Sequence, residues 1–432
     1  IRDRVVLCGC TVNKPAQTET TTAPDTAAAG ELTVRSVWIT YYELQAFTGK
    51  YDTGGDFYSA VSKAFAQLQR RGFTAVTVQV HPCADAFYRS KYFPVSVYCF
   101  GKAGGELKYD PLELLCKAAH ENQLKIEAWF NPYRVSQQDK IDKLSDDNIA
   151  KKWYKEKNGN VVIVNQKIYF NPASKAVQKR IVAGVREIVK NYPVDGIHFD
   201  DYFYPGQKFD DDDSYAKYGN GMNRADWRRE NVNKMVQAVH NDIKNYDSSI
   251  AFGISPTSVW ANKSSNALGS DTKAYESYNA IYADSRKWAL ENWVDYIAPQ
   301  VYTEIGNSAA DYKTVVDWWS DTLKNSKTKL YIGLADYKCS GVASTSPWYN
   351  GKAIKASMDY NRSVSKVEGE IHFRYKFLLA NDVNSVIKTA YANSYSAPAL
   401  DTVTKVQLTT QAPTTVVTTT CLLYTSDAAD DT

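Results

Sequence analysis

The segment DGIHFDDYFYP, which ends at Pro205, carries two adjacent carboxylates directly after a short apolar run. Because side chains alternate along a strand, His198 and Asp200 should share one face, and Asp201 follows where the strand gives way to a loop. Cleavage of a glycosidic bond needs one group that protonates the leaving oxygen and another that stabilises or attacks the cationic carbon. Asp200 and Asp201 are therefore the first candidates for catalysis, although Asp201 would equally suit a hydrogen bond within the loop that follows.

Polar and aromatic residues also follow other strand-like segments, where Glu127 and Glu304 are further candidates for a carboxylate partner of Asp200. Amides and guanidinium groups donate hydrogen bonds to sugar hydroxyls, and aromatic rings stack on sugar rings. The predicted substrate-binding residues are His81, Trp129, Asn131, Tyr133, Arg134, His198, Tyr202, Ser255, Gln300 and Tyr302. For Glu127, structural hydrogen bonding inside the fold is an equally good interpretation, and for His372 it is the better one.

Eight short β-rich segments alternate with helical segments between Val34 and Tyr395. The predicted strands cover residues 34–42, 74–80, 125–130, 194–199, 250–255, 294–301, 329–335 and 369–375. Their nearly continuous apolar runs are typical of strands that are buried on both faces of a parallel sheet. Apolar residues at helical spacing predict helices over 57–68, 177–188 and 232–243, and Asp110-Pro111 and Asn171-Pro172 indicate helix starts. Eight such units predict an α/β fold, the (β/α)8 TIM barrel.

Loop lengths indicate which end of this barrel carries the functional site. Helix-to-strand connections are short, whereas strand-to-helix connections are long and include residues 81–109, 131–171, 201–225 and 256–284. The extra chain therefore lies at the carboxyl ends of the strands, where barrel enzymes build their active sites. A doubly wound open sheet is the alternative fold, but its glycine-rich phosphate turn is missing from ITYYELQAF.

The composition narrows the class of partner. The 51 basic and 48 acidic side chains leave a net charge of +3, which argues against nucleic acid as a partner. The 31 Tyr and 10 Trp suit a carbohydrate ligand instead. We expect no cofactor and no metal, because CxxC spacing and Cys/His clusters are missing and the run 210–213 lacks the alternating ligands of a calcium loop. Cys83 and Cys99 could pair or remain free thiols, and the oligomeric state stays open.

Both ends of the chain differ in composition from the predicted barrel domain, which we place at residues 33–398. Residues 1–10 end in LCGC, which is similar to a lipobox, so we expect the end of a truncated lipoprotein signal with lipid on Cys10. Residues 11–32 and 399–420 are Thr-rich and predict linkers, and residues 421–432 are expected to be a non-native tail. No run of 18 apolar residues occurs, so we expect an extracytoplasmic protein held to the cell envelope by its lipid alone.

Several stretches, taken in order, resemble the glycosyl-hydrolase-like family 10 of bacterial envelope proteins, which is distinct from the family 10 xylanases. They are GFTAVTVQVHPCADAFY, YDPLELLCKAAHE, EAWFNPYRV, YFNPAS, VDGIHFDDYFYP, DWRRENVN, FGISPTSVWANKS, VDYIAPQVY and DYKTVVDWW, and the resemblance covers about Arg35 to Tyr391. It implies a barrel hydrolase that acts on glycans, with peptidoglycan as the substrate of at least some members, commonly as a lipoprotein. DGIHFDDYFYP is also similar to the strand-four signature of family 18 chitinases, but Tyr202 replaces the terminal Glu, so their substrate-assisted mechanism cannot be carried over.

Two segments depart from the family pattern, and both are predicted to lie at the barrel mouth. HFRYKFLL stands where a Ser-rich segment is usual, and Thr303 stands where an aromatic residue often follows Tyr302. Substrate preference could therefore differ from that of other members. The main prediction is a glycoside hydrolase that acts on peptidoglycan or a related polysaccharide, and the alternative is a non-catalytic glycan-binding envelope lipoprotein. A metal-dependent amidase is disfavoured because the first predicted strand, VWITYY, lacks the HxH ligands of that class.

Overall fold

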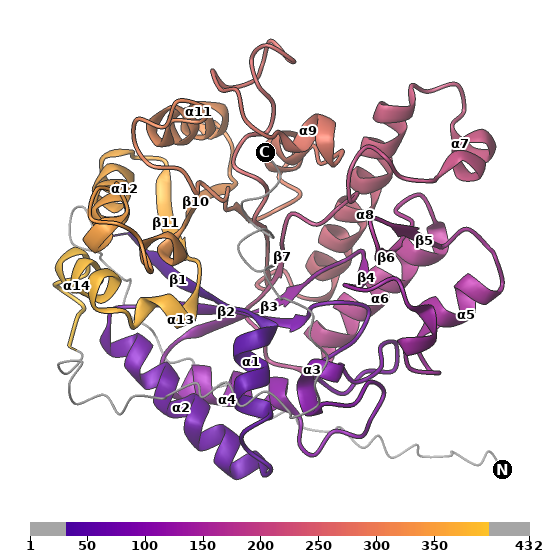
Figure 1. Cartoon of the computed structure of the whole chain (residues 1–432), viewed down its shortest axis with the longest axis horizontal. Coiled ribbons are helices and arrows are strands. Elements are labelled where there is room, and N and C mark those ends of the chain that lie inside the picture. Colours follow the sequence, from indigo (N-terminus) through magenta and orange to yellow (C-terminus); the bar gives the residue numbers. More distant parts are fainter. Residues whose placement is uncertain (1–31, 397–432) are drawn as a thin grey trace, which may run out of the picture.

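The computed structural model describes residues 32–396, in which eight parallel strands close into a barrel (Figure 1). The order around the barrel is β1 (Val34–Ile39), β11 (Val367–His372), β10 (Lys329–Leu334), β9 (Tyr296–Ile297), β8 (Ala251–Ile254), β7 (Gly196–Phe199), β3 (Lys125–Phe130) and β2 (Ala75–His81). Each strand starts within two residues of a predicted strand. The TIM barrel that the sequence predicted is confirmed.

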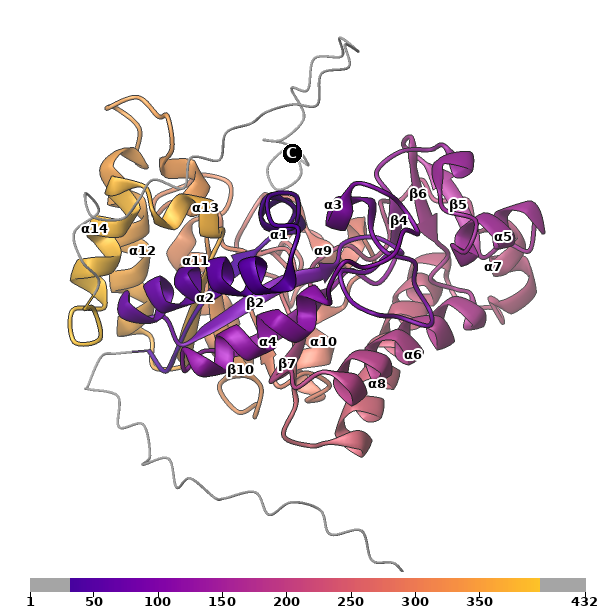
Figure 2. The same cartoon turned by 90° about the horizontal axis from the view of Figure 1, so that it is seen from below.

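Helices connect the successive strands and cover the outside of the barrel. The longer ones are α2 (Gly54–Arg70), α4 (Pro111–Glu121), α6 (Lys175–Asn191), α8 (Arg224–Tyr246), α11 (Tyr312–Leu323), α12 (Lys352–Ser363) and α14 (Asn381–Ala390). The shorter ones are α1 (Tyr41–Thr48), α3 (Val97–Phe100), α5 (Ile149–Lys155), α7 (Asp212–Tyr218), α9 (Ser277–Ala280), α10 (Ser285–Leu290) and α13 (Tyr375–Leu378), with 3-10 turns η1 (Ile141–Lys143), η2 (Asp336–Cys339) and η3 (Tyr349–Gly351). Neighbouring helices pack in pairs, as α2 and α4 do in Figure 2. Within residues 32–396 no helix is both long and apolar enough to cross a membrane.

One of the two predicted helix starts is correct. Asp110 caps α4, its carboxylate accepts backbone N–H groups of the first turn, and proline follows at the first helical position. The start predicted at Asn171 is wrong, because α6 begins later, with the Ser174 hydroxyl as its cap. The Asn171 side chain instead accepts the N–H of Ala173, which is a local turn contact that competes with helix capping.

A small antiparallel sheet, β4 (Arg134–Ser136), β6 (Lys167–Phe170) and β5 (Val161–Val164), lies within the long connection after β3. With α5 and α7 it forms the side of the molecule opposite α12 and α14 (Figure 1). From the sequence this connection is expected only as a long loop between a strand and a helix. Asn165 and Gln166 join β5 to β6 with φ of 49° and 58°, which is the turn geometry favoured in tight hairpins. The sequence VVIVNQKIYF, with two β-rich runs around this turn, is therefore of a kind that predicts a hairpin.

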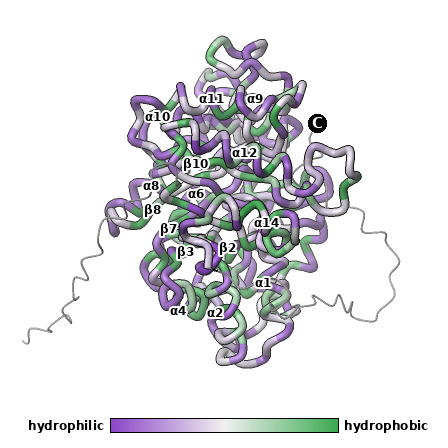
Figure 3. The backbone as a smooth tube through the Cα atoms, turned by 90° about the vertical axis from the view of Figure 1, so that its left-hand side faces the viewer, coloured by the Kyte–Doolittle hydropathy of each residue, from purple (hydrophilic) through white to green (hydrophobic). Residues whose placement is uncertain are grey.

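Hydrophobic and hydrophilic stretches alternate along the chain, as expected where each element has one buried face (Figure 3). The barrel interior itself holds large side chains, including Trp38, Trp129, Tyr296 and Tyr331. Glycines on the strands make room for them. A Cβ at Gly253 would lie 1.9 Å from the Tyr296 ring, so that ring can fill the barrel only because β8 has glycine there.

The structure shows the surroundings of the cysteines and of the acidic run 210–213, which are residue types that can form disulfides or bind calcium. Cys83, Cys99, Cys116 and Cys339 are buried and free. Asp211 is buried in an ion pair with Arg228 at 2.7 Å, so the acidic run is only partly the solvated loop that the sequence predicted. Within the described residues, no group of three His, Cys, Asp or Glu side chains is arranged to hold a metal ion.

Candidate active site

A cavity of about 320 Å³ opens at the carboxyl ends of the barrel strands, the end that the loop lengths predicted. Its charged lining residues are Asp200, Asp201 and Arg374, and Arg374 forms an ion pair with Glu43 at 3.2 Å. Half of the lining residues are aromatic: Trp38, Tyr41, Tyr42, Trp129, Tyr202, Tyr302, Tyr337, Phe373 and Phe377. Aromatic rings beside two carboxylates are suited to holding a sugar ring next to an acid.

Asp200 follows β7 directly and is only 2% exposed. Its Oδ2 accepts hydrogen bonds from Trp129 Nε1 at 2.9 Å and Asn131 Nδ2 at 3.1 Å, and its Oδ1 accepts the backbone N–H of Tyr202 at 3.2 Å. Burial raises the pKa of Asp200, while the Arg134 guanidinium and the three donors act in the opposite direction. These donors favour the ionised form and fix the orientation of both oxygens.

Asp201 lines the same cavity from the next position of the chain. The Thr257 hydroxyl donates to its Oδ2 at 3.4 Å, and the Gln300 amide also donates to the carboxylate. Burial, and then the negative charge of Asp200, raises the pKa of Asp201 to about 7. A carboxyl group with this pKa holds a proton in a large fraction of molecules at neutral pH and can act as a general acid.

The structure brings seven of the predicted site residues together around the cavity. They are Trp129, Asp200, Asp201, Tyr202, Ser255, Gln300 and Tyr302. Gln300 Nε2 donates to the carbonyl of Ser255 at 2.9 Å, which joins the ends of β8 and β9. Each of these residues lies near or beyond the carboxyl end of a barrel strand, and this shared position is why the sequence could predict them.

Two predicted residues lie behind the cavity wall. Asn131 is fully buried and reaches the cavity only through its hydrogen bond to Asp200. Arg134 donates from Nε and Nη2 to the carbonyl of Pro82 at 3.1 and 3.0 Å, and its guanidinium lies 4.6 Å from the centroid of the Tyr202 ring. Asn131 therefore orients a carboxylate, and Arg134 supports an aromatic wall.

Three further predicted residues are buried and do not line the cavity. Tyr133 is a fully buried core residue, and His81 stacks on Phe130 with 3.7 Å between ring centroids. The register between β2 and β3 shifts between Gln79 and His81, so the alternation that would point His81 inward is broken. His198 does point into the barrel, but it is fully buried beneath the residues that line the cavity.

Neither Glu127 nor Glu304 lines the cavity. Glu127 pairs in register with Gly196 at the start of β7, about 10 Å before the end of its own strand. It accepts the hydroxyl of Tyr296 at 2.6 Å. Glu304 lies beyond β9 and accepts the side-chain amide of Asn307 at 3.1 Å. Within residues 32–396, Asp200 and Asp201 are therefore the carboxylates available to a ligand in this cavity.

Several lining residues are not among those predicted from the sequence. Trp38, Tyr41 and Tyr42 belong to VWITYY, where the predicted strand runs to Tyr42 although β1 ends at Ile39 and α1 begins at Tyr41. When a strand is predicted to end too late, the residues after its true end are assigned to the strand and not to the barrel mouth. The unusual segment HFRYKFLL does lie at the mouth, as expected, and contributes Phe373, Arg374 and Phe377.

Comparison with known proteins decides the family. The family described as Glycosyl hydrolase-like 10 matches residues 33–350. The chain belongs to this family.

Curated relatives of this glycosyl hydrolase-like 10 protein support the assignment. Glycosyl hydrolase YngK of Bacillus subtilis (strain 168) is 40% identical over 350 residues, which cover 78% of this chain and 67% of YngK. Glycosyl hydrolase DigH of Escherichia coli (strain K12) is 38% identical over 324 residues, which cover 72% of this chain and 74% of DigH. Family membership and these names make the chain a glycosyl hydrolase-like enzyme.

Among solved structures, the PgaB (BpsB) glycoside hydrolase domain from Bordetella bronchiseptica is similar, with a TM-score of 0.55. The match covers 84% of this chain and 98% of that domain at 12% sequence identity. At this identity the likeness concerns the fold alone.

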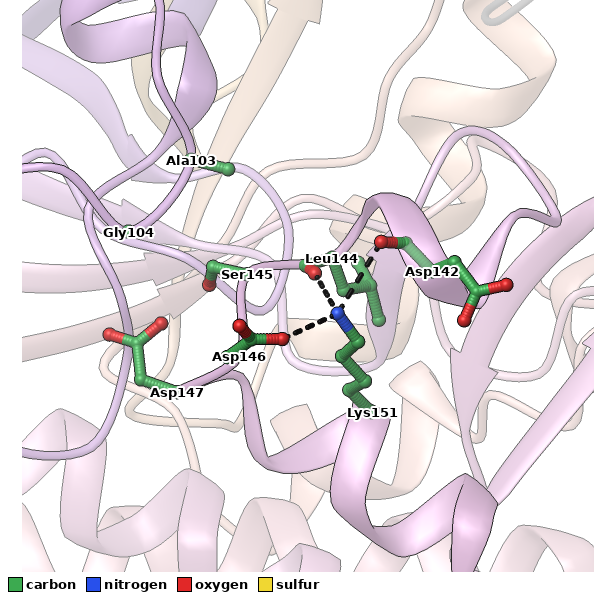
Figure 4. Close-up of a pocket in the computed structure, with 8 residues that line it drawn as sticks. All are labelled: Ala103, Gly104, Asp142, Leu144, Ser145, Asp146, Asp147 and Lys151. Carbon is green, nitrogen blue, oxygen red and sulfur yellow. Dashed lines mark hydrogen bonds and ion pairs between the residues drawn. The ribbon is translucent and has the colours of Figure 1, made fainter.

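This glycosyl hydrolase-like 10 protein has a second, more open hollow around α5 (Figure 4). It shares no lining residue with the barrel mouth. Its centre is the Lys151 ammonium, which donates to the carbonyl of Leu144 at 2.9 Å, the carbonyl of Asp142 at 3.4 Å and the carboxylate of Asp146 at 2.7 Å. The lysine already supplies the positive charge for these oxygens. We therefore interpret its contacts as structural, because they hold the loop that precedes α5.

Proposed function

We propose that this chain is a glycoside hydrolase that cleaves the glycan strands of peptidoglycan or a related envelope polysaccharide, with Asp200 and Asp201 as its catalytic carboxylates. The observation that carries the proposal is the different surroundings of two adjacent carboxylates in one aromatic cavity. Three donors orient Asp200, whereas burial and the neighbouring charge favour a proton on Asp201. The glycosyl hydrolase relatives support the reaction class. The sequence resemblance to envelope proteins supports the substrate class.

In the proposed reaction Asp201 donates its proton to the glycosidic oxygen as the bond to the anomeric carbon breaks. Positive charge develops on that carbon, and the oriented Asp200 carboxylate stabilises it. A water molecule adds to the carbon and returns a proton to the site, so one water is consumed and one new reducing end appears. The proton removed from Asp201 is thereby replaced.

The aromatic walls supply sugar binding in this proposal. The Tyr302 ring packs against Phe373 at 5.8 Å and against Tyr337 at 5.9 Å between centroids, so the loops after β9, β10 and β11 form one continuous wall. Trp38 continues that wall, with its ring 6.0 Å from Phe373. A wall of packed rings keeps its shape when the cavity is empty, which lowers the entropic cost of binding.

The test is to incubate the purified chain with intact peptidoglycan and with peptide-stripped glycan strands, and to measure new reducing ends. We expect reducing ends from at least one substrate, and we expect Asp200→Asn to bind the same glycan without releasing them. Glycan binding by the wild type with no reducing ends on either substrate would instead indicate the non-catalytic glycan-binding protein.

A further inference from the structure

A line of polar side chains, buried except for the half-buried Glu127, crosses the barrel interior from its amino end to the cavity floor. The Tyr296 hydroxyl donates to Glu127 Oε2 at 2.6 Å, and His198 Nδ1 lies 2.7 Å from the same hydroxyl. His198 Nε2 lies 3.1 Å from Trp38 Nε1 and 2.8 Å from Ser255 Oγ. Trp38 and Ser255 line the cavity, whereas His198, Tyr296 and Glu127 do not.

The direction of these hydrogen bonds follows from the chemistry of the donors. An indole N–H can only donate, so His198 Nε2 carries no proton, and its single lone pair is shared by the Trp38 N–H and the Ser255 hydroxyl, which then donates as well. A neutral imidazole must then carry its proton on Nδ1 and donate it to the Tyr296 oxygen. The Tyr296 hydroxyl, which accepts from His198, donates its own proton to Glu127 Oε2.

The surroundings of His198 and Glu127 bear on this arrangement of protons. Burial lowers the pKa of His198 to about 3, so the ring is neutral at physiological pH. Burial raises the pKa of Glu127 to about 7, while the hydroxyls of Tyr296 and Thr77, the latter 3.0 Å from Oε2, act in the opposite direction and favour the carboxylate as acceptor. The space for the Tyr296 ring exists only because residue 253 is glycine. Five strands thus contribute to one connected set of hydrogen bonds.

We propose that Glu127, Tyr296 and His198 are positioning residues for the cavity floor: Glu127 acts through Tyr296 to keep the His198 proton on Nδ1, and Nε2 then holds Trp38 and Ser255 in place for the glycan. The part concerning the glycan rests on the proposed function, whereas the part concerning His198 and Trp38 does not. Glu127 thus acts on the cavity from a distance and does not line it.

Loss of the acceptor at the far end has a defined consequence. Without an acceptor at position 127, the Tyr296 hydroxyl can donate to His198 Nδ1, and the imidazole proton moves to Nε2. Two N–H groups, from His198 and Trp38, would then face each other across 3.1 Å. The Trp38 indole would lose its acceptor, although no atom of Trp38 or its strand had been changed.

The experiment uses the full chain with ¹⁵N-labelled histidine and tryptophan. The chain has five histidines and 10 tryptophans, so few signals need assignment, and His198→Gln and Trp38→Phe identify the relevant ones. We expect the Nδ1–H tautomer in the wild type. In Glu127→Met and in Tyr296→Phe, we expect a population with the proton on Nε2 and a shifted Trp38 indole signal.

Two matched variants separate positioning from general disturbance of the barrel. Glu127→Gln retains an acceptor oxygen for Tyr296 and should keep the wild-type tautomer. Tyr331→Phe changes a ring that stacks on Tyr296 at 4.6 Å but belongs to no step of the hydrogen-bond line, and it should leave the His198 and Trp38 signals unchanged. A wild type with the proton on Nε2, or unchanged His198 and Trp38 signals in both Glu127→Met and Tyr296→Phe, overturns the proposal.

Activity provides the second measurement. On peptide-stripped glycan strands, KM should rise about tenfold in Glu127→Met, the effect of about one lost hydrogen bond, while kcat stays within about threefold because Asp200 and Asp201 are untouched. A wild type that shows the expected tautomer but releases no reducing ends contradicts the proposed function and leaves the hydrogen-bond line intact. An unchanged KM despite a shifted tautomer contradicts the positioning role alone.

Discussion

The indole N–H of Trp129 donates to the carboxylate of Asp200 across the β3–β7 strand pair, with 2.9 Å between Nε1 and Oδ2. The same indole lines the cavity and is 6% exposed. One side chain therefore contributes both an aromatic surface to the cavity and a donor that orients a carboxylate. The two contributions can be separated by substitution.

Trp129→Ala should weaken oligosaccharide binding by about 1–3 kcal/mol if its ring stacks on a sugar, as aromatic rings do on nucleic acid bases. Trp129→Phe keeps a ring but removes the donor to Asp200, so it should lose more activity than affinity. Titration calorimetry and reducing-end release measure the two effects. A sharply lower melting temperature with unchanged affinity in Trp129→Ala would identify Trp129 as a core residue instead.

Asp200→Asn should abolish most glycan hydrolysis while leaving the fold intact. The amide has nearly the same shape, and its single oxygen can still accept from Trp129 or Asn131. Removal of a group that acts in proton transfer or charge stabilisation typically lowers the rate 10²–10⁴-fold. Circular dichroism checks the fold, and reducing-end release checks turnover. Activity within a fewfold of wild type would mean that the chemistry does not depend on Asp200.

The pH dependence should reveal Asp201 as the acid. Its pKa of about 7 means that the protonated form is lost as pH rises through 7, so the rate should fall on the alkaline side of neutrality. The negative charge of Asp200 contributes to that raised pKa, so Asp200→Asn should lower the pKa of Asp201 and move its titration to more acidic pH. Infrared titration of the carboxyl group measures this directly. An alkaline limb that persists unchanged in Asp201→Asn would assign it to another group.

The sequence predicted the barrel well because its strands are short and apolar and alternate with helices whose ends are marked by turn and capping residues. This pattern depends little on distant contacts. It predicted Asp200 and Asp201 because they end a strand. The sequence could not distinguish Glu127 from these two aspartates. The distance of a residue from the mouth of the barrel depends on how the strands are aligned in the closed sheet, and single strand segments do not show this alignment. His81 was misplaced for a related reason: a shift of strand register leaves no mark in composition.

Lipid attachment at Cys10 is a prediction about a residue that lies outside the described part of the chain. The LCGC sequence and the Thr-rich stretch after it motivate the prediction that this cysteine carries lipid and anchors the protein to the cell envelope. In a bacterium that expresses the protein with its signal, radiolabelled palmitate should appear in the wild type and disappear in Cys10→Ala. Equal labelling of both would remove the lipobox interpretation.

The buried pair His372–Asp336 should control stability rather than catalysis. Both side chains are fully buried, and His372 Nδ1 lies 2.9 Å from Asp336 Oδ2. On its other side His372 Nε2 lies 2.9 Å from the Tyr391 hydroxyl, which donates to Glu370. Removing one partner leaves a buried charge without compensation, so His372→Gln should lower the free energy of unfolding by about 3–5 kcal/mol.

The pH dependence of this loss follows from the titration of His372. Burial would lower the pKa of His372, but Asp336 and then Glu370 together raise it above its ordinary value. The folded state therefore binds this proton more tightly than the unfolded state, so the pair contributes fully below about pH 6.5 and its contribution declines as pH rises through the raised pKa. Urea unfolding of wild type and His372→Gln should give curves of stability against pH that converge on the alkaline side. A constant difference between the two from pH 6 to pH 9 would mean that His372 does not titrate in the folded protein.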